Sequence, residues 1–173
     1  MITKMTRFNM KDFNKPNEDF IVSGKIIPTY EDNVWKYTEE IFSEPYFKKY
    51  EDEEIDMSYI EDDQKVVFLY YIENICIGRI MISTKWNGYA YIEDIAVGKD
   101  YRRNGIGVAL LNKAIEWAKE NGLCGLTLET QDINVSACHF YAKNNFKIGG
   151  VDTMLYSNFS TANEIAIFWY CKF

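Results

Sequence analysis

The 173-residue sequence has few of the side chains from which metal sites are built. It contains one histidine, His139, and its four cysteines include no Cys-x-x-Cys pair. A structural zinc site needs about four thiolate or imidazole ligands at short spacings, so we expect no metal. The cysteines lie in apolar or helical stretches, which favours buried or inert thiols over disulfides. They are Cys76, Cys124, Cys138 and Cys171.

Long apolar runs are also absent. No segment approaches the roughly 20 apolar residues that a membrane-spanning helix needs. Residues 1–15 mix charged with single apolar residues and hold no continuous apolar block, unlike a secretory signal. We therefore expect a cytoplasmic protein without a membrane partner.

Basic residues are outnumbered, with 19 Lys and Arg against 26 Asp and Glu and a net charge of −7. Contacts to phosphate backbones need basic residues in excess, so a nucleic acid partner is disfavoured. An acidic surface favours a cationic substrate, although acidity can also serve solubility alone. The most acidic stretch, residues 50–63, is either a solvated loop or helix face, or a negative rim over a cation site.

Apolar residues make up 47% of the chain and aromatic residues 16%, which is enough for a sizeable core. This length suits a single domain, which we expect to span residues 1–173.

The periodicity of the first half favours strands. A turn at Glu73–Asn74 separates two β-branched runs and predicts a hairpin. Pro45 is expected to start or break a helix. The predicted elements are a strand at 20–30, helical segments over 33–49, strands at 65–72 and 75–84, and a strand at 89–97.

The second half changes to a helical period. Apolar residues recur on one face over 105–121, and Gly122 is placed to end that helix in the left-handed conformation. A strand at 124–130, a helix at 134–144 and strands at 146–156 and 165–173 follow. The pattern predicts an α/β domain with a central mixed sheet and helices on both faces.

The stretch Arg102-Arg103-Asn104-Gly105-Ile106-Gly107 joins a strand to a helix. A helix N-terminus leaves N–H groups unpaired and attracts anions, and glycines let an anion approach the backbone. The arginines add positive charge, so the turn suits a pyrophosphate. A nucleoside-triphosphate loop would need Lys and then Ser or Thr after the second glycine, and a Rossmann turn needs a third glycine. Both are missing here.

The ordered set of motifs resembles the GNAT superfamily of acetyl-CoA-dependent N-acetyltransferases. It comprises the strand Ile92–Val97, the Arg-rich turn, Asn134 with Ala137, Phe140 and Tyr141, and Phe146. The resemblance implies the GNAT fold, with a mixed, mostly antiparallel central sheet, and direct acetyl transfer to an amine.

Within the superfamily the chain is most similar to streptothricin acetyltransferases. The stretches that carry this similarity are 24–28, 88–97, 128–132, 151–159 and 167–170. Streptothricins are strong cations with a β-lysine arm, which agrees with the negative net charge. The resemblance thus implies a small cationic amine as substrate.

Roles follow from the same resemblance. It implies Glu93 as the base, with Asp94 as the alternative base or cation holder, and Tyr141 as the acid. Strand alternation sends Glu93 and Asp94 to opposite faces unless a bulge, which the family has, intervenes. A backbone N–H in Ile95–Val97 is expected to hold the oxyanion. The residues implied to bind acetyl-CoA are Ile95, Ala96, Val97, Arg102, Arg103, Asn104, Gly105, Ile106, Gly107, Val108, Asn134, Ala137 and Tyr141.

Glu93, Asp94, Glu129 and Asp152 are the residues implied to meet the cationic substrate. We expect His139 to be a helix-surface residue and Cys138 to be structural, because no motif gives either a catalytic role. Two alternatives stay open. One is an acetyltransferase for polyamines or for protein lysine or N-terminal amines, and the other is a non-catalytic acetyl-CoA-binding module. A homodimer through the last strand also stays open.

Overall fold

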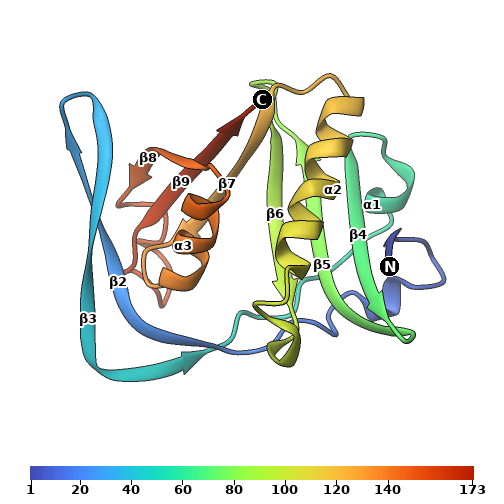
Figure 1. Cartoon of the computed structure of the whole chain (residues 1–173), viewed down its shortest axis with the longest axis horizontal. Coiled ribbons are helices and arrows are strands. Elements are labelled where there is room, and N and C mark those ends of the chain that lie inside the picture. Colours follow the sequence, from blue (N-terminus) through green and yellow to red (C-terminus); the bar gives the residue numbers. More distant parts are fainter. The chain divides into compact units, whose positions relative to one another are not determined.

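The computed structural model describes residues 1–173, and their contacts separate into two units (Figure 1). The first unit holds residues 1–20, 49–126 and 173, and the second holds residues 21–48 and 127–172. We describe each unit by itself. The single domain expected over residues 1–173 stays a prediction.

The sheet of the first unit has its strands in the order β1-β4-β5-β6, and neighbours are antiparallel. Glu73 and Asn74 join β4 to β5 with φ of 47° and 66°, the left-handed pair that a two-residue hairpin turn requires. The predicted hairpin is therefore confirmed. The strands are β1 (Ile2–Lys4), β4 (Lys65–Ile72), β5 (Ile75–Thr84) and β6 (Ala90–Val97).

One face of this sheet is covered by α2 (Ile106–Glu120), which packs along β4, β5 and β6 (Figure 1). Its apolar stripe is buried, as the 3.6-residue period predicts. The contact is close at Gly78, where a Cβ would lie 3.2 Å from side-chain atoms of both Ile106 and Leu110. The predicted helix is confirmed, and Gly122 follows its end with φ of 68°.

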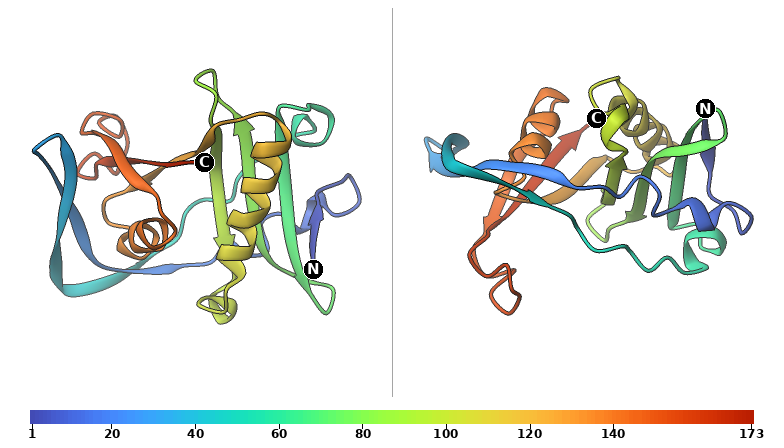
Figure 2. Two further views of the ribbon diagram at one scale, coloured as in Figure 1. Left: turned by 45° about the horizontal axis from the view of Figure 1, so that its top comes forward. Right: turned by 90° about the horizontal axis from the view of Figure 1, so that it is seen from below.

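The opposite face carries a buried cluster with the N-terminal segment and the short helix α1 (Ser58–Glu61) against it. Figure 2 shows the sheet of this unit with α1 and α2 on its two sides. The cluster consists of Met5, Phe13, Val67, Leu69, Cys76 and Met81, with Tyr59 and Ile60 packed on it. The prediction was a mixed, mostly antiparallel sheet with helices on both faces; in this unit the strands are antiparallel and helices lie on both faces.

The second unit contains a two-stranded sheet, β2 and β3, and three strands in the order β7-β9-β8. Trp169 is fully buried in its core, and its indole Nε1 donates to Thr130 Oγ1 at 3.0 Å. The elements are β2 (Phe20–Glu31), β3 (Val34–Lys48), β7 (Gly125–Gln131), α3 (Val135–Lys143), β8 (Lys147–Asp152) and β9 (Ala166–Lys172).

The helical segments predicted over 33–49 are wrong, because this stretch is the strand β3. Asp32 and Asn33 adopt φ of 52° and 61° and reverse the chain, so residues 34–48 pair with β2. The strands approach closely at Gly24, where a Cβ would lie 2.2 Å from the Glu40 carbonyl oxygen. Cross-strand pairing therefore outweighs the local helical preference, and Pro45 lies inside a strand.

The strand predicted at 146–156 ends earlier, at Asp152. The Asp152 Oδ1 accepts hydrogen bonds from the backbone N–H groups of Met154 at 2.7 Å and Leu155 at 3.0 Å. This local capping turns the chain out of the strand. Two 3₁₀ turns, η1 (Met10–Asp12) and η2 (Lys99–Tyr101), complete the elements. None of the helices combines the length and the apolar character needed to cross a membrane.

Candidate active site

Strand β6 contains a bulge at Glu93. Ile92 pairs with Ile82 of β5 and Asp94 pairs with Met81, so Glu93 is an extra residue without a partner in β5. A bulge of this kind brings two successive side chains to the same side of a strand. The bulge that the family resemblance implied is therefore present, and Glu93 and Asp94 do not alternate.

Asp94 is held by a buried arginine from the neighbouring strand. Arg79 is 1% exposed, and its Nε donates to Asp94 Oδ2 at 2.5 Å. Its Nη1 donates to the carbonyl oxygen of Phe13 at 3.0 Å and to Asn14 Oδ1 at 2.6 Å, while its guanidinium lies 4.2 Å from the centre of the Phe13 ring. The Asp94 charge is thus already compensated inside the unit, which leaves Asp94 a poor choice as base.

Glu93 has a different partner. The hydroxyl of Tyr59, from α1, donates to Glu93 Oε2. Burial, together with the Glu93 carboxylate, raises the pKa of the Tyr59 phenol, so this hydroxyl stays protonated and acts as a donor. Glu93 is half-buried and has no cationic partner, because Arg79 pairs with Asp94. Its carboxylate can therefore interact with a cationic group of a ligand.

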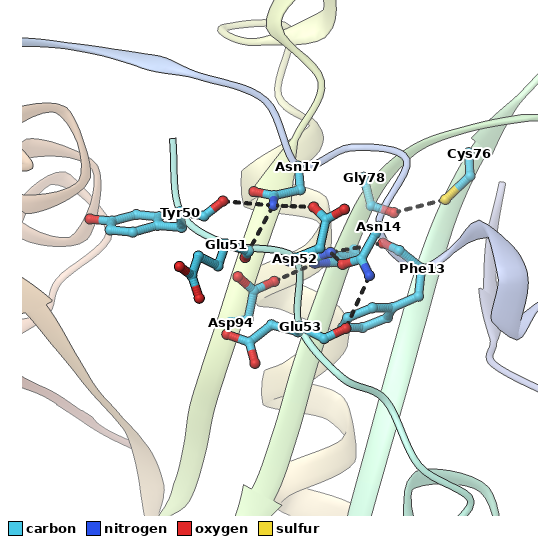
Figure 3. A network of polar contacts seen from close by, with 11 residues as sticks. Phe13, Asn14, Asn17, Tyr50, Glu51, Asp52, Glu53, Cys76, Gly78 and Asp94 are labelled. Carbon is cyan, nitrogen blue, oxygen red and sulfur yellow. Dashed lines mark hydrogen bonds and ion pairs between the residues drawn. The ribbon is translucent and has the colours of Figure 1, made fainter. Parts of the chain in front are cut away.

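The acidic stretch that begins at Tyr50 is attached to the N-terminal segment (Figure 3). Asn17 Nδ2 donates to the Tyr50 carbonyl oxygen at 3.1 Å and to Asp52 Oδ1 at 2.7 Å. Asn14 Nδ2 donates to the Glu53 carbonyl oxygen at 3.0 Å. Desolvation, and then the charges of Asp94 and Glu93, raise the pKa of the Glu53 carboxyl. The stretch is therefore an anchored segment beside the bulge, and not only a solvated loop.

The turn before α2 has the geometry that an anion requires. Gly105 is the N-cap residue with φ of 80°, and the ladder of the helix begins when Ala109 N–H donates to the Gly105 carbonyl oxygen at 3.0 Å. No side chain caps this N-terminus, and no atom lies within 4 Å of the place where a Gly105 Cβ would stand. The first N–H groups of α2 therefore have no side-chain cap, and Gly105 leaves open space beside them, which fits a pyrophosphate.

The two arginines of the turn differ in their surroundings. Arg102 uses its guanidinium within the unit, donating to the carbonyl oxygens of Val97 at 2.9 Å, Asp19 at 2.7 Å and Glu18 at 3.3 Å. Arg103 is exposed and adopts φ of 63°. Arg102 thus braces the turn, and Arg103 is the arginine whose charge remains directed to solvent or a ligand.

In the second unit, Tyr141 is 4% exposed and lies among aromatic rings, with centroids 5.3 Å from Phe146 and 6.5 Å from Trp169. Asn134 is the N-cap of α3, and its Oδ1 accepts from the Ala137 N–H at 3.2 Å. The amide oxygen of Asn134 therefore caps the helix.

The two other predicted acidic residues also have partners in this unit. Tyr156 donates its hydroxyl to Glu129 Oε1, and burial raises the pKa of the Glu129 carboxyl. Asp152 caps the turn after β8, as described above. Glu129 thus has the environment of a half-buried carboxylate, whereas Asp152 has a local structural role.

The remaining reactive side chains serve the fold. Cys138 is buried, its Sγ lies 3.4 Å from Thr130 Oγ1, and burial raises its pKa to about 12. His139 lies on the surface of α3 as predicted, and its Nε2 contacts a carboxylate oxygen of Glu39. All four cysteines are free thiols; Cys76 and Cys138 are buried, Cys171 is partly buried, and Cys124 is exposed. No group of three or more His, Cys, Asp or Glu side chains could hold a metal ion.

Sequence reasoning missed the residues that set the state of the two carboxylates in β6, namely Tyr59 and Arg79. Tyr59 lies within the acidic stretch, whose sequence signal is its charge and does not mark a single aromatic residue. Arg79 stands inside an apolar strand, and a single charge in such a run is a usable signal of a buried ion pair.

Comparison with known proteins agrees with this geometry. Residues 32–146 match the model of the acetyltransferase (GNAT) family. Streptothricin acetyltransferase A of Bacillus subtilis (strain 168) is 72% identical over 173 residues, which is 100% of both chains. Streptothricin acetyltransferase of Escherichia coli is 36% identical over 110 residues, 63% of each chain.

Solved structures are similar over almost the whole chain. A Bacillus anthracis str. Ames protein, described as a streptothricin acetyltransferase and solved in complex with acetyl coenzyme A, superposes with a TM-score of 0.93 and 36% identity. The match covers 100% of this chain and 99% of that chain. Nourseothricin acetyltransferase, at 24% identity and a TM-score of 0.85, covers 99% and 97% and shares the fold. The predicted GNAT fold is confirmed.

Proposed function

The chain belongs to the GNAT acetyltransferase family, and on that basis we propose that it acetylates an amine of streptothricin or a closely related cationic antibiotic. The observation that carries this proposal is the 72% identity, over the full length of both chains, to a relative named streptothricin acetyltransferase A. The acceptor would be an amine of the β-lysine arm, and acetylation would confer resistance. Acetyl-CoA is the acetyl donor.

The chemistry requires a base, because an alkylammonium has an unperturbed pKa of about 10 and is protonated near neutral pH. We assign this role to Glu93. Its carboxylate leaves the strand at a bulge and is not neutralised by an arginine, in contrast to Asp94. Asp94 is accordingly reassigned from possible base to a residue that shapes the bulge with Arg79.

The transfer also requires groups that stabilise charge on the acetyl carbonyl and on the leaving sulfur. Acetyl-CoA supplies an activated thioester. We assign the oxyanion contact to a backbone N–H in Ile95–Val97 and the proton donor to the phenol of Tyr141. Asn134 and Ala137 begin the helix that carries Tyr141 and are proposed to line the path of the coenzyme arm.

The phosphates of acetyl-CoA are proposed to lie on the turn before α2. Its backbone N–H groups would donate hydrogen bonds to the phosphate oxygens, and Arg103 would add charge, while Arg102 would hold the loop in shape. The other residues of this turn that we assign to the coenzyme are Asn104, Gly105, Ile106, Gly107 and Val108.

Glu129 is proposed to meet a second positive group of the substrate, because a cation would offset the cost of its burial. Asp152 is assigned to the same region with a weaker role, since its carboxylate already caps a turn. We further propose that residues 1–173 act as one catalytic domain, in the cell interior where acetyl-CoA is available. The coverage of whole chains by the relatives supports the single catalytic domain.

Thiol release from acetyl-CoA tests the proposal. The purified protein is offered streptothricin, spermidine and a lysine-rich peptide side by side, with Glu93→Gln as the matched control. Rapid release with streptothricin alone, lost in the control, is the expected result. Release with spermidine or the peptide but not with streptothricin would contradict the substrate, and no release with any amine would favour a non-catalytic acetyl-CoA-binding module.

A further inference from the structure

The bulge in β6 creates a problem for the carboxylate it presents. In a regular strand the pleat and the paired neighbours fix the direction of a side chain, but Glu93 has no partner in β5. A base must be held within hydrogen-bond reach of the proton it removes. Some contact outside the strand is therefore needed to orient Glu93.

Tyr59 supplies that contact. Its hydroxyl donates to Glu93 Oε2 from an element 34 residues earlier in the chain, while Oε1 makes no hydrogen bond within the protein. The carboxylate is therefore oriented through one oxygen and presents the other. This division suits a base, because accepting a proton on Oε1 leaves the hydrogen bond at Oε2 in place.

The tyrosine is itself held from several directions. Its ring packs against the buried cluster of the first unit, and Lys65 Nζ lies 4.8 Å from the ring centre. The same ammonium donates to Ser58 Oγ at 3.0 Å. Asp56 Oδ1 accepts from the N–H of Ser58, the first residue of the short helix, at 2.7 Å. These contacts place the phenol more firmly than four helical residues could alone.

We propose that Tyr59 is a positioning residue that holds the Glu93 carboxylate for proton removal from the substrate ammonium. The inference rests on the proposed role of Glu93 as base. In the step, an ammonium N–H bond breaks and an O–H bond forms on Glu93 Oε1. The freed amine lone pair then attacks the acetyl carbonyl carbon and forms the N–C bond, and the C–S bond of the thioester breaks to release coenzyme A as a thiolate, which takes its proton from the donor proposed above, Tyr141. Tyr59 keeps its own proton throughout.

Tyr59→Phe tests the inference, because it removes the hydroxyl and keeps the ring. The matched control is Tyr71→Phe. Tyr71 also donates to a carboxylate, Asp12 Oδ2 at 2.8 Å, and also packs on the same cluster, but it does not contact Glu93. We expect kcat to fall roughly 10- to 100-fold in Tyr59→Phe, with KM for acetyl-CoA unchanged, and to stay within about twofold in Tyr71→Phe.

A double-mutant cycle with Glu93→Gln separates positioning from general destabilisation. If Tyr59 acts through Glu93, adding Tyr59→Phe to Glu93→Gln lowers kcat no further. Equal losses in Tyr59→Phe and Tyr71→Phe, or additive losses in the cycle, would overturn the inference. Full activity of Glu93→Gln alone would instead overturn the proposed base, so the two failures are distinguishable.

A second variant tests the inference in case Tyr59→Phe does not fold. Glu93→Asp shortens the carboxylate and withdraws it from the Tyr59 hydroxyl without altering the helix. A fall in kcat at unchanged KM for acetyl-CoA is the expected result. Wild-type kcat in Glu93→Asp would show that the contact does not matter and would overturn the inference. All assays use the amine that supports the fastest thiol release.

Discussion

In each unit a tyrosine hydroxyl donates to a glutamate carboxylate, yet the two pairs have different surroundings. The Tyr59–Glu93 pair of the first unit lies at a strand bulge, beside the ion pair of Arg79 and Asp94. In the Tyr156–Glu129 pair of the second unit, Glu129 lies on β7, Tyr156 lies in the turn region after β8, and burial raises the pKa of the carboxyl.

The difference shows how one hydrogen-bonded pair can serve two purposes. Glu129 bears a cost of desolvation that a cationic ligand would offset, which suits recognition of a charged substrate group. Glu93 is oriented by Tyr59 and directed away from the strand pairing, which suits proton transfer. We therefore expect substitutions at the first pair to act mainly on kcat and at the second pair mainly on the KM of the amine.

The largest effect is expected from Glu93→Gln. The amide keeps the size of the side chain but cannot accept the ammonium proton, so kcat should fall about 10²- to 10⁴-fold. Binding of acetyl-CoA, measured by calorimetry, should be unaltered. Asp94→Asn is a poor control because it breaks the buried pair with Arg79, so Glu129→Gln serves instead. Retention of kcat in Glu93→Gln would remove the distinction between the two pairs.

Arg79→Met removes the ion pair with Asp94 that lies beside the Tyr59–Glu93 pair. It leaves Asp94, whose side chain is 20% exposed, without its cation, and we expect the free energy of unfolding to fall by about 3–5 kcal/mol. Urea denaturation measures this. The matched control is Arg7→Met, whose ion pair with Glu61 has side chains 69% and 57% exposed and should contribute about 0–1 kcal/mol. Similar losses in both variants would contradict a special role for the buried pair.

The second pair is tested by Glu129→Gln. Loss of a charged contact to the substrate should raise KM for the amine about tenfold while kcat changes little. Steady-state kinetics with streptothricin measures both constants. If kcat collapsed and KM stayed the same, Glu129 and not Glu93 would be the better candidate for the base.

The smallest effect concerns pH and stability. Because burial raises the pKa of Glu129 in the folded state, that state binds this proton more tightly than the unfolded chain. Stability from this group is thus fully present below the unfolded pKa of about 4.3 and is lost as pH rises through the higher folded value. A glutamine at position 129 binds no proton in this pH range, so this pH-dependent contribution to stability is absent in Glu129→Gln.

Urea unfolding of the wild type and Glu129→Gln at several pH values checks this sign. The stability of the variant relative to the wild type should increase as pH rises from about 4 toward neutrality. The hydrogen bond from Tyr156 lowers the pKa of Glu129 and so opposes part of the rise caused by burial, but the net direction is upward. A difference that is flat or that decreases with pH would show that burial does not raise the pKa of Glu129.

Much of the fold could be predicted because its signals are local. Glu73–Asn74 marked a two-residue turn, Gly122 marked the end of α2, and an apolar stripe marked that helix. The failure over 33–49 has the same origin. Asp32–Asn33 is an equally good turn, but its effect on β3 depends on pairing with β2, which the helical interpretation did not consider.

Only part of the candidate site could be predicted from the sequence. Glu93 and the glycines before α2 were identified from their motifs, and the bulge was anticipated from the family resemblance. The hydrogen-bond partners of the site residues could not be predicted. Asp94, Arg102 and Asn134 looked equally available to substrate or coenzyme, but each uses polar atoms in bonds within its own unit.

The sequence by itself determined the strands and helices with strong local patterns, the glycine-containing turn before α2 and the acetyltransferase family. The tertiary structure decided which charges are already paired. Arg79 reaches Asp94 across 15 residues, Tyr59 reaches Glu93 across 34, and Arg102 reaches the Asp19 carbonyl across 83. Backbone preferences act over a few neighbouring residues, whereas the state of a carboxylate depends on whichever donor the fold brings within about 3 Å of it.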